Sequence, residues 1–129
     1  MQQIDLRLLG KGNYQLLNDV FFRGAGWNVS VLKGFVFDGA SIPESLWSIV
    51  GCPTDFAFAG CIHDAIYRSR LLDRKTADKI FHNALLASGV ELSKAKAMYL
   101  AVRVGGESAY DDARHMMAHY RNYVKVLPK

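Results

Sequence analysis

The sequence is organised around residues 61–67, which read Cys-Ile-His-Asp-Ala-Ile-Tyr, and residues 77–81, which read Ala-Asp-Lys-Ile-Phe. His63 and Tyr67 are four residues apart, so on a helix they lie on one face, one turn apart. The surrounding residues are mostly apolar, and a buried imidazole among them needs a polar partner because an unsatisfied one is costly. We expect Asp78, on the following helix, to be that partner.

Asp64 follows His63 but points about 100° away from it round a helix. It therefore cannot orient the imidazole ring, and we expect it to face either a cation or water. The spacing alone leaves two interpretations of this group open. It is either a core histidine with satisfied hydrogen bonds beside two ordinary acids, or a constellation that performs chemistry.

The helical periodicity around this stretch predicts two neighbouring helices. The first spans residues 54–72 with Thr54 as its N-cap, and the second ends near Ser88, because Gly89 is a strong C-terminal signal. The connection between them is short, so the two helices should be antiparallel neighbours, with Asp78 close to the histidine.

Short alternating segments come before these helices and predict a small antiparallel sheet, with Asn18-Asp19 as a tight hairpin turn. Beyond the helix pair, the pattern predicts a helix through Val104 capped by Ser93, and a last helix over residues 107–126. The predicted class is therefore α+β, mainly α. We expect one domain over residues 1–129: a β-rich part (1–36), a loop and short helix (37–53) and a helical part (54–129).

The composition is that of a globular protein, because 50% of the 129 residues are hydrophobic and 12% are aromatic. No apolar run reaches the roughly 18 residues of a membrane span, and no secretory signal is visible at the N-terminus. Cys52 and Cys61 do not make a disulfide framework, which fits synthesis in a reducing cytosol.

The net charge is +4. Such a surface attracts anionic lipid or nucleic acid, although an ordinary solvated helix face explains the same charges, since acids are mixed among them. Nucleic acid is not expected as a partner. Much of the excess positive charge lies in the C-terminal half, at Lys94, Lys96, Arg103, Arg114, Arg121, Lys125 and Lys129.

Two further segments could bind a metal ion or an anion, and each also has a purely structural interpretation. The loop over residues 33–43 can present carbonyl oxygens to a metal or amides to an anion, or it connects a strand to a helix capped by Ser41. His115 and His119 are four residues apart and could bind zinc, but no Glu or Cys ligand accompanies them, so solvent-facing histidines are the preferred interpretation.

The motifs His63-Asp64-x-x-Tyr67 and Ala77-Asp78-x-x-Phe81 resemble the catalytic helix pair of phospholipase A2. The likeness is closer to the phospholipase domain of the parvovirus minor capsid protein, where a Gly-x-Pro and an Asp come first, as Gly51-Cys52-Pro53 and Asp55 do here. The resemblance implies His63 as general base, Asp78 as its partner, Tyr67 as support for Asp78 and Asp64 as a calcium ligand. The spacing of the glycine-rich calcium loop of that family is not found here, so carbonyls of residues 37–41, with Asp38 and Gly39, or of residues 50–52 would have to complete the Ca²⁺ site.

A second resemblance covers residues 14–110 and is to a family of uncharacterised phage and prophage proteins. Its motifs are Phe37-Asp38-Gly39-Ala40-Ser41-Ile42-Pro43, the His-Asp-x-x-Tyr motif and Tyr99-x-Ala101-Val102-Arg103. This likeness indicates a family and implies no activity.

Together these resemblances predict a phage-encoded, phospholipase A2-like protein that hydrolyses a phospholipid ester with calcium at a membrane surface. One alternative is a non-catalytic phage virion or host-interaction module whose contact surface includes Trp27, Phe35, Phe37 and Trp47, although core packing is the more usual role of such aromatics. Another is a hydrolase that uses a different metal. Phage virion proteins are the expected partners of the non-catalytic module, which would be made in the bacterial cytoplasm and then incorporated into the virion.

Overall fold

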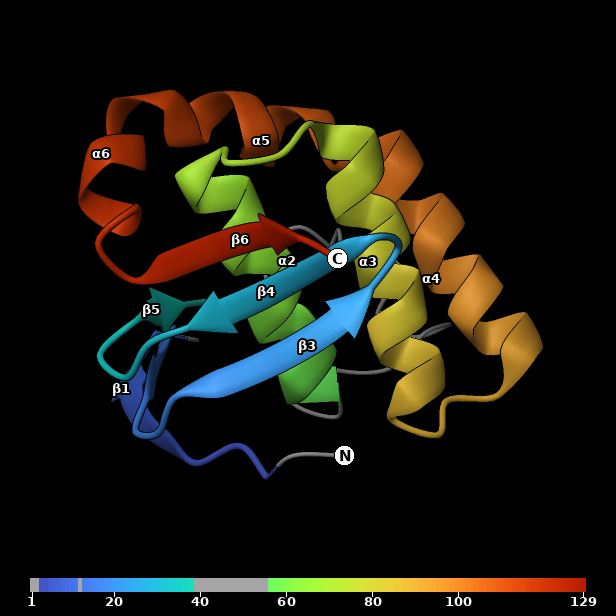
Figure 1. Ribbon diagram of the computed structural model, residues 1–129, viewed down its shortest axis with the longest axis horizontal. Helices are drawn as coiled ribbons and strands as arrows, with labels where there is room; N and C mark the ends of the chain where they lie inside the picture. The colour runs from blue at the N-terminus through green and yellow to red at the C-terminus, as the bar shows by residue number, and fades with distance from the viewer. Residues whose placement is uncertain (1–2, 12, 39–55) are drawn as a thin grey trace.

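The computed structural model describes residues 3–11, 13–38 and 56–129. Two small antiparallel sheets built mainly from the N-terminal strands pack against a layer of helices (Figure 1). The class is therefore α+β, as the sequence predicts. Thr54, Ser41, Trp47, Cys52 and the Gly-x-Pro segment lie outside the described residues, so the predictions made for them have no structural counterpart here.

The first sheet has the strand order β1-β2-β5. β1 (Leu6–Gly10) and β2 (Asn13–Leu16) form a hairpin, and β5 (Val36–Phe37) adds to the other edge of β2. Its pairing places Tyr14 opposite Phe37, and their rings lie 5.8 Å apart. This sheet therefore holds the end of β5, and with it Asp38, in a fixed position.

The second sheet has the strand order β3-β4-β6. β3 (Val20–Gly24) and β4 (Trp27–Val31) are joined through Ala25 and Gly26, whose φ values of 50° and 87° suit the tight turn of a twisted hairpin. The predicted strands in this part of the chain are confirmed. The third strand, β6 (Val124–Pro128), comes from the C-terminus and pairs with β4.

Asn18-Asp19 is not a hairpin turn, because the strands on either side of it belong to different sheets. The two side chains instead stabilise a corner between the sheets. Asn18 accepts a hydrogen bond from the Asp5 amide at 2.8 Å, and Asp19 accepts one from the Lys33 amide at 2.8 Å. The prediction was wrong because Asn and Asp favour any local reversal of the chain, including one that leaves the sheet.

Three long helices form the body of the protein. α2 (Ala57–Ser69) and α3 (Arg74–Ala87) pack side by side as a helical hairpin, and α4 (Leu92–Gly105) packs on the outer side of α3. α3 ends within a residue of the predicted end near Ser88, and Gly89 follows with a φ of 87°. The N-cap of α4 is Glu91 and not Ser93, because the Glu91 carboxylate accepts the Ser93 amide proton at 3.2 Å.

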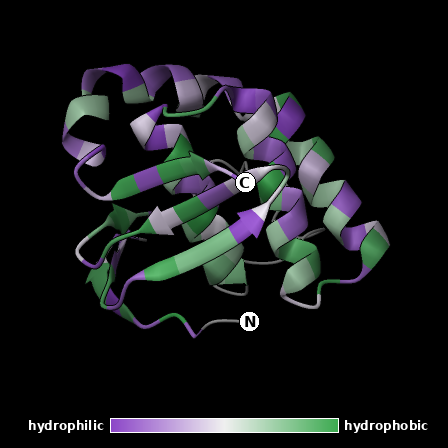
Figure 2. Ribbon diagram, viewed as in Figure 1, coloured by the Kyte–Doolittle hydropathy of each residue, from purple (hydrophilic) through white to green (hydrophobic). Residues whose placement is uncertain are grey.

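The last predicted helix is wrong. Residues after Gly106 form only short pieces, α5 (Glu107–Asp112), a 3₁₀ turn (Ala113–His115) and α6 (Met117–Tyr120), before the chain becomes β6. At the start of β6 the hydrophilic Lys125 stands between two valines, as the colours of Figure 2 show, and Val124 is buried against the sheet. The alternation decides the structure because it places one face of the strand in the core.

The main hydrophobic core lies between the two sheets and α2, and it includes Phe35 and Phe37, which are 0% and 3% exposed. For these two aromatics the core interpretation is correct, and Trp27 packs against the same cluster. A second cluster joins α2, α3 and α4 through residues such as Phe81 and Met98. None of the helices in the described part of the chain is long and apolar enough to cross a membrane.

Candidate functional site

α2 and α3 bring the three sequence-predicted catalytic residues together. His63 Nε2 lies 2.7 Å from Asp78 Oδ1, and the Tyr67 hydroxyl donates a 2.6 Å hydrogen bond to the same oxygen. The predicted contact between the two helices is therefore present. It arises because His63 and Tyr67 share one face of α2 and Asp78 borders the apolar stripe of α3.

The imidazole of His63 is completely buried, with 0% exposure. Its ring lies between two aromatic rings, Tyr67 at 4.1 Å and Phe81 at 4.6 Å between centroids. This packing fixes the plane of the imidazole. The hydrogen bond to Asp78 then fixes which ring nitrogen faces the carboxylate.

Asp78 is also fully buried, and its carboxylate has four partners. Besides His63 and Tyr67, it accepts a 2.7 Å charge-assisted hydrogen bond from Arg103 Nη1 on α4, and Arg74 Nη1 lies 3.5 Å away. Burial by itself raises the pKa of Asp78, but the hydrogen bonds from His63, Tyr67 and Arg103 outweigh it and hold the pKa below its ordinary value of 3.8. Asp78 is therefore ionised at neutral pH.

Tyr67 is the neutral donor of this cluster. Burial raises the pKa of its phenol above the ordinary value of 10.0, and the hydrogen bond to the Asp78 carboxylate raises it further. The ionised Asp78 can only accept, so the facing Nε2 of His63 carries its proton. In a neutral imidazole Nδ1 is then the nitrogen that can take up a proton.

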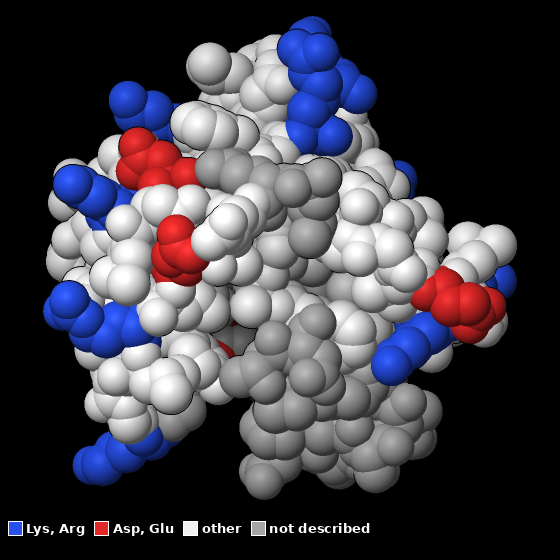
Figure 3. Space-filling model, turned by 90° about the horizontal axis from the view of Figure 1, so that it is seen from below, with Lys and Arg blue, Asp and Glu red and all other residues white. Residues whose placement is uncertain are grey.

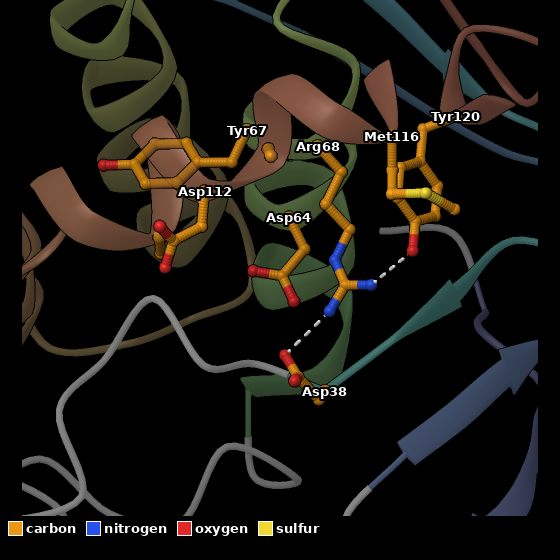
Figure 4. Close-up of a pocket in the computed structure, with 9 residues that line it drawn as sticks. Asp38, Asp64, Tyr67, Arg68, Asp112, Met116 and Tyr120 are labelled. Atoms are coloured by element: carbon orange, nitrogen blue, oxygen red, sulfur yellow. Dashed lines mark hydrogen bonds and ion pairs between the residues drawn. The ribbon is translucent and has the colours of Figure 1, made fainter. Parts of the chain in front are cut away.

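Asp64 faces a different site, as its position on α2 predicts. It is 3% exposed and lines a pocket of about 280 Å³ between α2, the end of β5 and the α5–α6 segment (Figure 4). Asp38, the second predicted metal ligand, lines the same pocket, whereas Gly39 lies outside the described residues. The other described lining residues are Tyr67, Arg68, Ala109, Asp112, Ala113, Met116 and Tyr120.

Arg68 lies beside both predicted metal ligands (Figure 4). Its Nη2 is 3.0 Å from Asp38 Oδ1, and Figure 4 shows Asp64 beside this ion pair. Burial lowers the pKa of Arg68, but the charges of Asp64 and Asp38 outweigh that effect and raise it. In the described part of the pocket, a guanidinium therefore pairs with Asp38 and is attracted by Asp64.

Arg103, Arg68 and Gly106 are three residues whose importance the sequence reasoning missed. Arg103 was counted with the solvated surface charges, yet it binds the buried Asp78. A Cβ at Gly106 would lie 2.5 Å from the Val102 carbonyl oxygen and 2.6 Å from the Tyr67 hydroxyl, so only glycine fits there. The spacing of Arg68 four residues after Asp64 was a usable signal for that pair.

The remaining candidate ligands lie apart from this centre. His115 and His119 are exposed and belong to different short helices, so their spacing does not place them on one helix face. Across the described residues no three His, Cys, Asp or Glu side chains gather as a metal site would require. Cys61 is free and buried, and burial raises the pKa of its thiol, which makes it unreactive.

Comparison with known proteins gives a family but no activity. The family described as "Protein of unknown function (DUF1353)" matches residues 14–102. The chain belongs to this family. The match includes Asp38, the whole of α2 and α3, and most of α4, but it ends one residue before Arg103.

Two relatives come from Sinorhizobium fredii (strain NBRC 101917 / NGR234). "Uncharacterized protein y4jT" is 37% identical over 98 residues, which cover 72% of this chain and 29% of that protein. "Uncharacterized protein y4iH" is 34% identical over 103 residues, which cover 75% of this chain and 42% of that protein. The chain thus spans less than half the length of either relative. No solved structure matches it.

Proposed function

We propose that this protein is a phospholipase A2-like hydrolase that cleaves a phospholipid ester with His63 as general base. The observation that carries the proposal is the buried chain of hydrogen bonds in which His63 Nε2 and the Tyr67 hydroxyl both meet Asp78 Oδ1. A phage setting and action at a membrane surface are parts of the same proposal, and they rest on the sequence resemblance and the net charge of +4.

In this mechanism His63 Nδ1 takes a proton from water as the water attacks the ester carbonyl. Asp78 holds the ring in the productive tautomer and stabilises the imidazolium that forms. Tyr67 and Arg103 keep the Asp78 carboxylate oriented and ionised. His63 then returns the proton to the leaving alkoxide, so the base is regenerated.

The burial of His63 sets a condition on this proposal. The described residues that line the 280 Å³ pocket include its neighbours Asp64 and Tyr67, but not His63 itself. Water and an ester must therefore reach the imidazole through an opening of the site, which contact with a lipid surface can favour. A protein that never exposes His63 cannot be this hydrolase.

Calcium is the part of the proposal that the described residues support least. When bound, the ion would polarise the ester carbonyl and stabilise its developing negative charge. Asp38 and Asp64 are hard oxygen ligands, but calcium takes 6–8 such ligands and Arg68 already pairs with Asp38 at 3.0 Å. The set fits neither calcium nor another divalent metal while Arg68 is in place, so no step is routed through an ion.

One observation favours a second candidate, a non-catalytic phage virion or host-interaction module. Asp78 is paired with two arginines as well as with His63, and all the described buried side-chain polar atoms have partners. Such a complete network also fixes the packing of three helices without any chemistry. In that case His63 and Asp78 would be structural.

The test is fatty-acid release from vesicles by the purified protein. Zwitterionic and anionic phospholipid vesicles are each incubated with calcium or with a chelator. We expect turnover that falls about 10²–10⁴-fold in His63→Ala. His115→Ala is the matched control, because that histidine is exposed and outside the site. Each variant is first shown to be folded by circular dichroism.

Turnover that survives His63→Ala would assign the activity to another group or a contaminant. If neither vesicle type is cleaved with calcium or chelator, the hydrolase proposal fails. The non-catalytic module would then take its place.

A further inference from the structure

We propose that Arg68 is a built-in cation that takes the place of a divalent metal ion between Asp38 and Asp64. The inference concerns the pocket of the proposed hydrolase, but it does not depend on ester cleavage. The cation of this pocket is then a side chain, whereas the phospholipase resemblance implies a calcium ion.

Arg68 is anchored from three directions. Nη2 pairs with Asp38 Oδ1 at 3.0 Å, Nη1 donates to the Tyr120 hydroxyl at 2.9 Å, and Nη1 also lies 3.4 Å from the Val36 carbonyl oxygen. The guanidinium carbon is 5.3 Å from the centre of the Tyr120 ring, within range of a cation–π contact. The end of β5, α2 and α6 thus hold one positive charge in a fixed place.

The anchoring makes this charge hard to displace. The Arg68 side chain is 22% exposed and keeps its proton under all ordinary conditions. Both neighbouring carboxylates attract it, which raises its pKa despite burial. Its planar group offers several donors at once, whereas a lysine could offer only a point charge.

A divalent ion would have to compete with this arrangement. It would need the same carboxylate oxygens that now face the guanidinium, and it would be repelled by a positive charge about 3 Å from one of them. Among the described lining residues, Arg68 is the one that carries a positive charge, so its replacement takes the guanidinium away from Asp38 and Asp64. The carboxylates should then accept a hard cation.

Calcium titration calorimetry tests this on the whole protein. We expect no binding to the wild type at millimolar calcium, and at least tenfold tighter binding to Arg68→Met. The double variant Arg68→Met/Asp64→Asn should lose that gain. Arg70→Met is the control, because Arg70 is close in the chain but lies over the Tyr110 ring, 4.4 Å away, and not in the pocket.

A second measurement does not depend on the stability of any variant. Amide resonances of residues 36–38 and 64–68 are followed by NMR while calcium is added to the wild type. The inference predicts no saturable shift, and a saturable shift at these amides would overturn it. A folded Arg68→Met protein that gains no calcium binding would overturn it as well. Neither outcome depends on vesicle hydrolysis, so failure of the proposed activity is a separate result.

Discussion

His63 and Asp64 are adjacent in the chain, yet α2 sends them into two sites that differ in almost every physical respect. His63 joins a buried cluster around Asp78, in which both carboxylate oxygens have partners within 2.7 Å. Asp64 joins a solvent-reaching pocket where the Asp38 and Arg68 side chains are 35% and 22% exposed. A rotation of about 100° round one helix thus separates a buried charge network from a pocket that reaches solvent.

The two sites differ in how much free energy an unpaired charge costs. In the buried cluster, an unpaired charge would cost several kcal/mol, so every group must be matched. In the pocket, water screens the charges, and an ion pair there contributes about 0–1 kcal/mol. The buried cluster should therefore control stability, and the pocket should control which ligand or ion binds.

The largest expected effect comes from removing the central carboxylate. Asp78→Asn leaves Arg103 and Arg74 without their counter-charge at the edge of the buried cluster, and we expect a loss of about 3–5 kcal/mol in the free energy of unfolding. Asp38→Asn, its counterpart in the pocket, should lose less than about 1 kcal/mol. Urea unfolding followed by circular dichroism measures both, and equal losses would contradict the contrast between the sites.

The two arginines that pair with Asp78 should contribute unequally to the free energy of unfolding. Arg103→Met removes a 2.7 Å charge-assisted hydrogen bond, worth about 1.5–3 kcal/mol. Arg74→Met removes a looser 3.5 Å pair within one helix and hydrogen bonds to the Val102 and Arg103 carbonyls at the end of α4. We expect a loss of about 1 kcal/mol. The same urea titrations rank the two, and a larger loss for Arg74→Met would show that its role at the end of α4 dominates.

Glycine substitutions test how tightly the cluster is enclosed. Gly106→Ala drives a Cβ against the Val102 carbonyl and the Tyr67 hydroxyl, so we expect a loss of about 1–3 kcal/mol. Gly60→Ala, in the interior of α2, meets no described atom within 4 Å and should gain up to about 1 kcal/mol from helix propensity. Thermal unfolding of the two variants should therefore shift in opposite directions.

The helix hairpin was predictable because its signals are local. A short connection, an apolar stripe and Gly89 suffice to bring His63, Tyr67 and Asp78 together. Arg103 could not be placed in the same way, because an arginine on an amphipathic helix looks identical in sequence whether it faces solvent or a buried acid. Its partner lies 25 residues away on another helix, so only the packing of α4 reveals the contact.

Long-range contacts were also the unpredictable part of the sheets. The strands themselves were predictable from alternation, but their partners were not, since β4 pairs with a strand from the other end of the chain. Long-range pairing also explains why residues 124–126 are not helical. Helix geometry correctly predicts that Asp64 points away from His63. A cation or water was expected to face Asp64, and Arg68, one turn along the same helix, was overlooked.

The smallest expected effect concerns pH and isolates Tyr67 within the buried cluster. Its pKa is raised in the folded protein, so its contribution to stability is complete below the unfolded value of 10.0 and is lost as the pH rises above it. The loss should approach about 1.4 kcal/mol per pH unit, since only the unfolded phenol ionises there.

Tyr67→Phe should cost about 1 kcal/mol at pH 7 through the lost hydrogen bond. It should also make stability fall less steeply than in the wild type above pH 10, as urea titrations at several pH values would measure. An unchanged slope in Tyr67→Phe would mean that its hydroxyl is not locked onto Asp78 in solution, and the contrast between the two sites would then lose one of its supports.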